Sequence, residues 1–307
     1  MWVRLVSTLS IAGSLLAACG SDPGSAPTGV SLAARSIRGG APTGVTLVAR
    51  GGFKSPVDAV ASPEGKTFYF SARTEGGEPA VFRVSSHPGS VATVMVTGAP
   101  LSAPRGLVLS CDGSTLYVAG GDSPIYELPT AGGALRDLGV TGIREIAGLA
   151  IGTDCGTLFA SGRTADNRPA LFRINAGGGS AQVVFAGAPL VAPTGLYVDR
   201  SGVTWVMDLG ANQTGALYAV PPDGSAAKLV GGDLPTSNVF AGVSLISSGD
   251  TAVIATRGQL TTIELASGER SDVPVPGIIA PAGLRTARRA AVFAIADIGG
   301  DAIFRAD

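Results

Sequence analysis

The side chains that could carry out chemistry are few, and they exclude several reaction types. The sequence contains one histidine, His87, within the turn-like run Ser-Ser-His-Pro-Gly. A serine or cysteine nucleophile needs a neighbouring base, most often histidine, and a lone histidine in a tight turn is poorly placed for that role. A zinc site of several histidines and cysteines is excluded by their number. We therefore predict no catalytic residues of these kinds.

Charged side chains instead gather between apolar runs, where they could contact a partner. The densest cluster is Arg163-Thr-Ala-Asp-Asn-Arg168. Because a planar guanidinium pairs well with anions, this run is either a docking loop for a protein or small polar ligand, or a solvated hairpin. The candidates on such segments are Asp58, Arg105, Arg144, Arg163, Asp166, Asn167, Arg168, Asp208, Asn212, Arg257 and Asp297.

A sequence repeat positions these segments. Its anchors lie 48, 42, 47, 47 and 41 residues apart, at Asp58, Gly106, Gly148, Gly195, Gly242 and Gly283. After each anchor, short apolar runs alternate with variable residues at period two, which indicates strands. A repeat of this length, rich in turn residues, is typical of a β-propeller blade. We predict an all-β, six-bladed propeller of four-stranded blades, with strands A to D running from the centre of the ring outward.

The ends of the repeat region predict how the ring closes. The last unit stops at Asp307, directly after its third strand, which would leave an open edge. The run Val45–Arg50 precedes the first unit, so we expect it to complete the C-terminal blade, with the propeller spanning residues 44–307. The segment 26–35 nearly duplicates 41–50. The sequence leaves open which copy closes the ring.

The register also predicts which residues share an end of the ring. The A–B and C–D turns share one end, and the D–A and B–C loops share the other. The candidates above lie at the second end, where we expect an unknown protein or a small polar ligand to bind. Cys111 and Cys155 fall in the A–B turns of adjacent blades. Since such turns lie side by side, we predict a disulfide between them, with two free thiols as the alternative.

The blades resemble known propeller families. The segments 205–220 and 293–305 look like NHL-type repeats, and Pro104-Arg-Gly-Leu-Val-Leu-Ser-Cys-Asp-Gly-Ser-Thr-Leu-Tyr117 is similar to gluconolactonase-like propellers. The second resemblance implies a divalent ion held over the channel by Glu, Asn and Asp. Here Asp58 stands where the Glu is expected and Thr194 where an Asn is expected. If the site were retained, Asp58, Asp208 and Asp297 would hold Ca²⁺ or another divalent ion; otherwise we expect no cofactor.

The N-terminus predicts export and a lipid anchor. Arg4 precedes the apolar stretch Leu5–Leu16, which is too short to span a bilayer and suits a signal peptide. Leu16-Ala17-Ala18-Cys19 resembles the bacterial lipobox, although a plain secretory signal with an incidental cysteine is the alternative. We expect a signal peptide over 1–18, lipidation at Cys19, and a Gly/Ser/Pro-rich tether over 19–43.

Composition and motifs together favour a binding role. The net charge of −1 and the lack of a basic stripe argue against a nucleic-acid partner. We therefore expect a lipoprotein of the cell envelope, facing the periplasm from the outer membrane in a two-membrane cell. Its propeller would be a non-catalytic binding or scaffolding module. The alternative is a divergent metal-dependent hydrolase of the gluconolactonase type.

Overall fold

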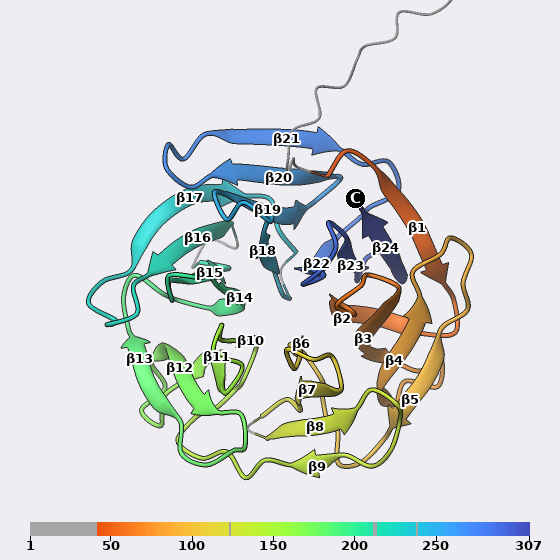
Figure 1. Cartoon of the computed structure of the whole chain (residues 1–307), viewed down its shortest axis with the longest axis horizontal. Helices are drawn as coiled ribbons and strands as arrows, with labels where there is room; N and C mark the ends of the chain where they lie inside the picture. The colour runs from red at the N-terminus through yellow and green to blue at the C-terminus, as the bar shows by residue number, and fades with distance from the viewer. Residues whose placement is uncertain (1–41, 123, 211–213, 238) are drawn as a thin grey trace, which may run out of the picture. The chain divides into compact units, whose positions relative to one another are not determined.

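The computed structural model describes residues 42–122, 124–210, 214–237 and 239–307. These residues form six four-stranded antiparallel sheets arranged as the blades of a β-propeller (Figure 1). The predicted fold class is therefore confirmed. The predicted signal peptide, the lipidation site Cys19, nearly all of the tether, and Asn212 lie outside the described residues. No helix long and apolar enough to cross a membrane occurs in the described part of the chain.

Each blade takes its strands from one repeat unit, in the order A to D. Blades one and two contain β2 (Lys54–Ala61), β3 (Thr67–Arg73), β4 (Pro79–Ser85), β5 (Thr93–Thr97), β6 (Leu107–Leu109), β7 (Thr115–Ala119), β8 (Ile125–Pro129) and β9 (Arg136–Asp137). Blades three and four contain β10 (Leu149–Ile151), β11 (Thr157–Arg163), β12 (Pro169–Asn175), β13 (Gln182–Ala186), β14 (Pro193–Val198), β15 (Thr204–Asp208), β16 (Gly215–Val220) and β17 (Lys228–Leu234). Blade five contains β18 (Val243–Leu245), β19 (Thr251–Thr256), β20 (Gln259–Glu264) and β21 (Arg270–Pro274), and blade six begins with β22 (Pro281–Thr286), β23 (Phe293–Asp297) and β24 (Ala302–Ala306).

The ring closes with an N-terminal strand, as predicted. Strand β1 (Val45–Arg50) pairs antiparallel with β24 and supplies the D strand of blade six. The Thr43 and Gly44 amides donate to the Asp307 carbonyl over 2.9 and 3.1 Å. The second copy of the duplicated segment is therefore the one that closes the ring, while the first copy lies outside the described residues.

The anchor glycines are explained by the crowding of strands at the centre. Neighbouring A strands meet there backbone to backbone, and the Gly106 amide donates to the Ala147 carbonyl over 2.8 Å. A Cβ on Gly106 would lie 2.6 Å from the Gly148 Cα, and a Cβ on Gly148 or Gly195 would overlap a carbonyl of the next blade. Only glycine fits at these places, which is why it recurs at the blade period.

The apolar core lies between the blades, in clusters that each join two neighbours. Between blades six and one, Phe53, Phe70 and Phe82 are fully buried, and the rings of Phe70 and Phe82 stack with centroids 5.1 Å apart. Equivalent clusters of Leu, Val and Ile fill the other junctions. Because each A strand packs on both neighbours, the inner strands form a fixed wall around the central channel.

Candidate functional site

The central channel contains a cavity of about 1040 Å³ at the A–B end of the ring. Its wall consists of the second and third residues after each anchor, so all six inner strands contribute. At these positions blades one to three contribute aliphatic side chains, namely Val60, Ala61, Val108, Leu109, Ala150 and Ile151, and Pro63, Ser110 and Thr153 line the cavity next to them at the A–B turns. Blades four to six contribute a more polar set, namely Tyr197, Val198, Ser244, Leu245, Arg285 and Thr286. The cavity is thus apolar on one side and polar on the other.

A buried ion pair crosses the channel beneath this cavity. Arg285 Nε and Nη2 both lie 3.3 Å from Asp58 Oδ2, and the two side chains are 7% and 0% exposed. Asp58 also accepts hydrogen bonds from the Leu107 and Ala59 amides, and Arg285 Nη1 donates to the Leu196 carbonyl over 2.9 Å. These bonds tie blade six to blades one and four, and through Asp58 to blade two. The pair is the floor of the cavity.

Burial sets the acid–base character of the floor. It raises the pKa of the Asp58 carboxyl above its ordinary value, and the Arg285 charge together with the Leu107 and Ala59 amides opposes that rise. Asp58 was a candidate ligand-contacting and metal-binding residue. In the structure its carboxylate is occupied by protein donors and has no exposed surface. Its evident task is to neutralise Arg285 inside the ring.

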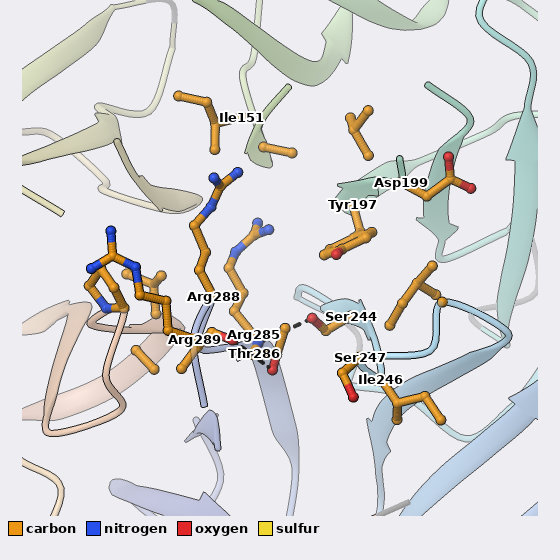
Figure 2. Close-up of a pocket in the computed structure, with 18 of the residues that line it drawn as sticks. Ile151, Tyr197, Asp199, Ser244, Ile246, Ser247, Arg285, Thr286, Arg288 and Arg289 are labelled. Carbon is orange, nitrogen blue, oxygen red and sulfur yellow. Dashed lines mark hydrogen bonds between the residues drawn. The ribbon is translucent and has the colours of Figure 1, made fainter. Parts of the chain in front are cut away.

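A second arginine of blade six spans the mouth of the cavity. Arg288, in the turn between β22 and β23, extends in the same direction as Arg285 (Figure 2). Its Nη1 lies 2.8 Å from Cys111 Sγ and 4.0 Å from Cys155 Sγ. These two cysteines form the predicted disulfide between blades two and three, with Cα atoms 5.6 Å apart. Arg288 therefore reaches across the ring from blade six to the opposite rim.

The remaining charged side chains of the mouth have their own partners or face solvent. Arg289 Nη1 donates to Glu64 over 2.9 Å. Asp199 accepts from Trp205 Nε1 over 2.8 Å and from the hydroxyl and amide of Ser201. Arg200 is exposed at the rim. Burial raises the pKa of the Tyr197 hydroxyl, and the positive charge of Arg288 opposes this. The cavity therefore carries positive charge at its mouth.

The aspartates predicted to form a metal site are not brought together. Asp208 Oδ2 accepts from the Val191 and Ala192 amides over 2.9 and 3.1 Å. Asp297 accepts from the Ile279 and Ala280 amides over 2.9 and 2.8 Å. Each carboxylate thus fastens the D–A loop of its own blade to the end of its B strand, while Asp58 lies in the floor. Among the described residues, no group of three or more His, Cys, Asp or Glu side chains is placed to hold a metal ion.

The charged loop of blade three is a hairpin whose charges are mutually paired. Arg163 Nε lies 3.2 Å from Glu145 Oε2, and Arg168 Nε lies 2.7 Å from Asp166 Oδ2. Hydrogen bonds from the Thr164 hydroxyl and from Arg168 lower the pKa of the exposed Asp166 carboxyl. Asn167 has a φ of 66°, a left-handed conformation common for asparagine in turns. Arg163 and the segment 166–168 therefore lie together, as the sequence predicted, but they bind one another.

The other candidates at this end are dispersed over separate blades. Arg144 exchanges backbone hydrogen bonds with Arg163. The Arg105 amide donates to the Ala119 carbonyl, and the Arg257 amide donates to the Pro235 carbonyl. None of the described candidates at the D–A and B–C loops lines the cavity. A partner at this end stays a prediction.

Sequence reasoning missed the cavity residues, although one signal was present. The second residue after each anchor reads Val60, Val108, Ala150, Tyr197, Ser244 and Arg285. This position is aliphatic in blades one to three but holds the charged Arg285 in blade six, and such a departure from the repeat indicates a specialised site. The turn that follows, Ala287-Arg-Arg-Ala-Ala291, also lacks the Gly and Asp residues that fill most equivalent turns.

Comparison with known proteins supports the fold alone. No family model matches the chain, and no curated protein does. A structural genomics protein of unknown function from Bacteroides thetaiotaomicron superposes with a TM-score of 0.63 and 16% identity over 86% of this chain and 72% of that one. A chain of a nidogen/laminin complex gives 0.60 and 16%, over 75% and 85%. A catalytically inactive virginiamycin B lyase from Staphylococcus aureus, solved with quinupristin, gives 0.54 and 14%, over 86% and 98%.

Proposed function

We propose that this protein is a binding module of the cell envelope, which holds a small ligand in the cavity at the A–B end without changing it chemically. The observation that supports this is the cavity itself, about 1040 Å³ and open at one end of the ring. Its size is that of pockets that accept small organic ligands, and its wall is rigid because its residues belong to inner strands, to A–B turns and, for Phe293, to the start of β23.

The lining side chains support binding over catalysis. They are aliphatic, hydroxyl and guanidinium groups with a tyrosine and an aspartate. Asp199 is committed to Trp205 and its own turn, and the single histidine, His87, contacts Ser85 at the β4–β5 turn. A hydrolase would need a base within reach of a nucleophile or water in the cavity. The streptogramin lyases have a similar ring, but at 14% identity this likeness is no evidence that the present protein catalyses their reaction.

A cavity-filling substitution tests this function. We expect Ala150→Trp to block the cavity, while Ala165→Trp in the exposed blade-three hairpin leaves it open. The full chain is incubated with a small-molecule extract of the source cells, and retained compounds are released and weighed by mass spectrometry. A compound held by wild type and Ala165→Trp but not by Ala150→Trp, and recovered with unchanged mass, is the expected result. Recovery of a product of altered mass, or no retained compound, contradicts the proposal.

The envelope location rests on the lipobox-like run Leu16-Ala17-Ala18-Cys19, which lies outside the described residues. Two or more acyl chains on Cys19 would hold the ring at a membrane surface. We expect the wild-type protein to enter the detergent phase of a Triton X-114 separation. Cys19→Ala should keep its signal peptide and carry no lipid. Mass spectrometry of the wild-type N-terminal peptide should show the added mass of the acyl chains, which would confirm lipidation. Cleavage at the same position in both proteins, with no acyl mass on the wild-type N-terminal peptide, would contradict the anchor.

A further inference from the structure

We propose that the ligand of the cavity is an amphipathic anion, a molecule with one phosphate or carboxylate group on an aliphatic body. The inference rests on the proposed binding function and specifies its ligand class. It follows from three features of the cavity: the division of its wall, the charge at its mouth, and the availability of Arg288.

The division of the wall calls for a ligand with two unlike sides. The residues that blades one to three contribute from their inner strands are all aliphatic, and Ser110 and Thr153 of these blades line the cavity only at the A–B turns. Val60, Val108 and Ala150 occupy the repeat position that holds Arg285 in blade six. A purely polar ligand would gain no binding free energy from this aliphatic surface, because it has no apolar groups to bury against it. An alkyl chain laid against it removes apolar area from water, and each buried methylene tightens binding about fourfold.

The charge at the mouth calls for an anion. The charged side chains lining the cavity are Arg200, Arg285, Arg288, Arg289 and Asp199. Arg285 is neutralised by Asp58 and Arg289 by Glu64, whereas Asp199 accepts bonds from Trp205 and its own turn. In the described part of the chain, neither Arg200 nor Arg288 lies within 4.0 Å of a carboxylate. The two guanidinium groups of Arg200 and Arg288 outnumber the single Asp199 carboxylate, so the mouth keeps a net positive charge.

Arg288 is the side chain that would bind the anionic group. Its side chain lines the cavity and extends in the same direction as that of Arg285 (Figure 2). The acceptor it contacts is Cys111 Sγ, and a disulfide sulfur is a weak acceptor. A phosphate or carboxylate oxygen would form stronger, charge-assisted bonds with the planar fork and could replace the sulfur contact without loss. The alkyl chain would then run inward along blades one to three.

The test uses octyl phosphate as the probe and the full chain in phosphatidylcholine nanodiscs, which avoids detergent. Calorimetric titration, corrected with empty discs, is expected to show saturable one-to-one binding. Inorganic phosphate and 1-octanol, each carrying one half of the probe, should bind at least tenfold more weakly. Octanol binding as tightly as octyl phosphate would overturn the anionic assignment, and inorganic phosphate doing so would overturn the apolar one.

Variants locate the two halves of the site. Arg288→Gln should weaken octyl phosphate binding at least tenfold and leave octanol unchanged, with Arg288→Lys recovering part of the loss. Val108→Ser should weaken octyl phosphate through its chain. Arg136→Gln, which removes an exposed arginine on β9 of the outer rim, should bind as wild type does. Equal binding by Arg288→Gln and wild type would refute the proposal even if a neutral compound is retained by the cavity, so the two proposals fail separately.

The source of such an anion is distinguished by the lipid of the disc. If octyl phosphate binds equally in discs with and without phosphatidylglycerol, the ligand is a free amphiphile, as proposed. Competition by the anionic lipid would assign the cavity to a membrane headgroup and overturn the free-ligand assignment.

Discussion

The two ends of the channel differ in whether their charged side chains already have strong hydrogen-bond partners. At the D–A end, Asp208 and Asp297 are buried, and their oxygens accept backbone amides of their own loops. At the A–B end, Arg288 stands exposed over a disulfide, next to a cavity that its neighbours do not fill. The charged hairpin of blade three also lies at the first end, and its Arg163 and Arg168 side chains are already paired with carboxylates. A binding site is therefore better indicated by a charged side chain that lacks a strong partner and lies beside a cavity than by the number of charged residues.

The Asp58–Arg285 ion pair lies between these two ends, and removing one partner of it should have the largest effect on stability. We expect Asp58→Asn to lower the free energy of unfolding by about 3–5 kcal/mol, because Arg285 would be left buried without its counter-charge. The double variant Asp58→Asn/Arg285→Met should lose less stability than the sum of the losses of the two single variants, because each single variant already breaks the same ion pair. Urea denaturation measures this. The exposed pair Arg289–Glu64 is the matched control, and Glu64→Gln should change stability by less than about 1 kcal/mol.

A loss below about 1 kcal/mol for Asp58→Asn would contradict this account of the floor. It would mean that the ring holds Arg285 by the Leu196 carbonyl and packing alone.

A smaller effect is expected at the D–A end. Asp208→Asn should lower stability by about 1–3 kcal/mol, because the Val191 and Ala192 amides lose a charged acceptor, and it should leave octyl phosphate binding unchanged. Thermal unfolding with and without Ca²⁺ completes the comparison. We expect no rise in the wild-type unfolding temperature. A rise that is abolished by Asp208→Asn would favour the metal-dependent hydrolase and contradict a purely structural aspartate.

The fold could be predicted because its causes are local and repeated. A glycine is needed wherever two A strands touch, so Gly106, Gly148 and Gly195 mark the blade period directly. The disulfide followed from the same register, since Cys111 and Cys155 occupy equivalent turns. The missing outer strand of blade six likewise pointed to Val45–Arg50.

The site could not be predicted because its causes are not repeated. Asp58 and Arg285 lie 227 residues apart, and nothing in either local sequence shows that they pair. Sequence analysis also could not tell that Asp208 and Asp297 would be consumed by backbone amides, since an aspartate after a strand suits a capping or a binding role equally. The end of the ring that holds the cavity depends on how side chains from six blades fill the channel, which only the assembled ring decides.

The most direct measurement is a crystal structure of the full chain with octyl phosphate. The account predicts the phosphate oxygens within hydrogen-bond distance of the Arg288 guanidinium, with the alkyl chain against Val60, Val108 and Ala150. A probe bound over the D–A and B–C loops, or one whose chain lies on the Tyr197 and Ser244 side with its phosphate away from Arg288, would contradict it.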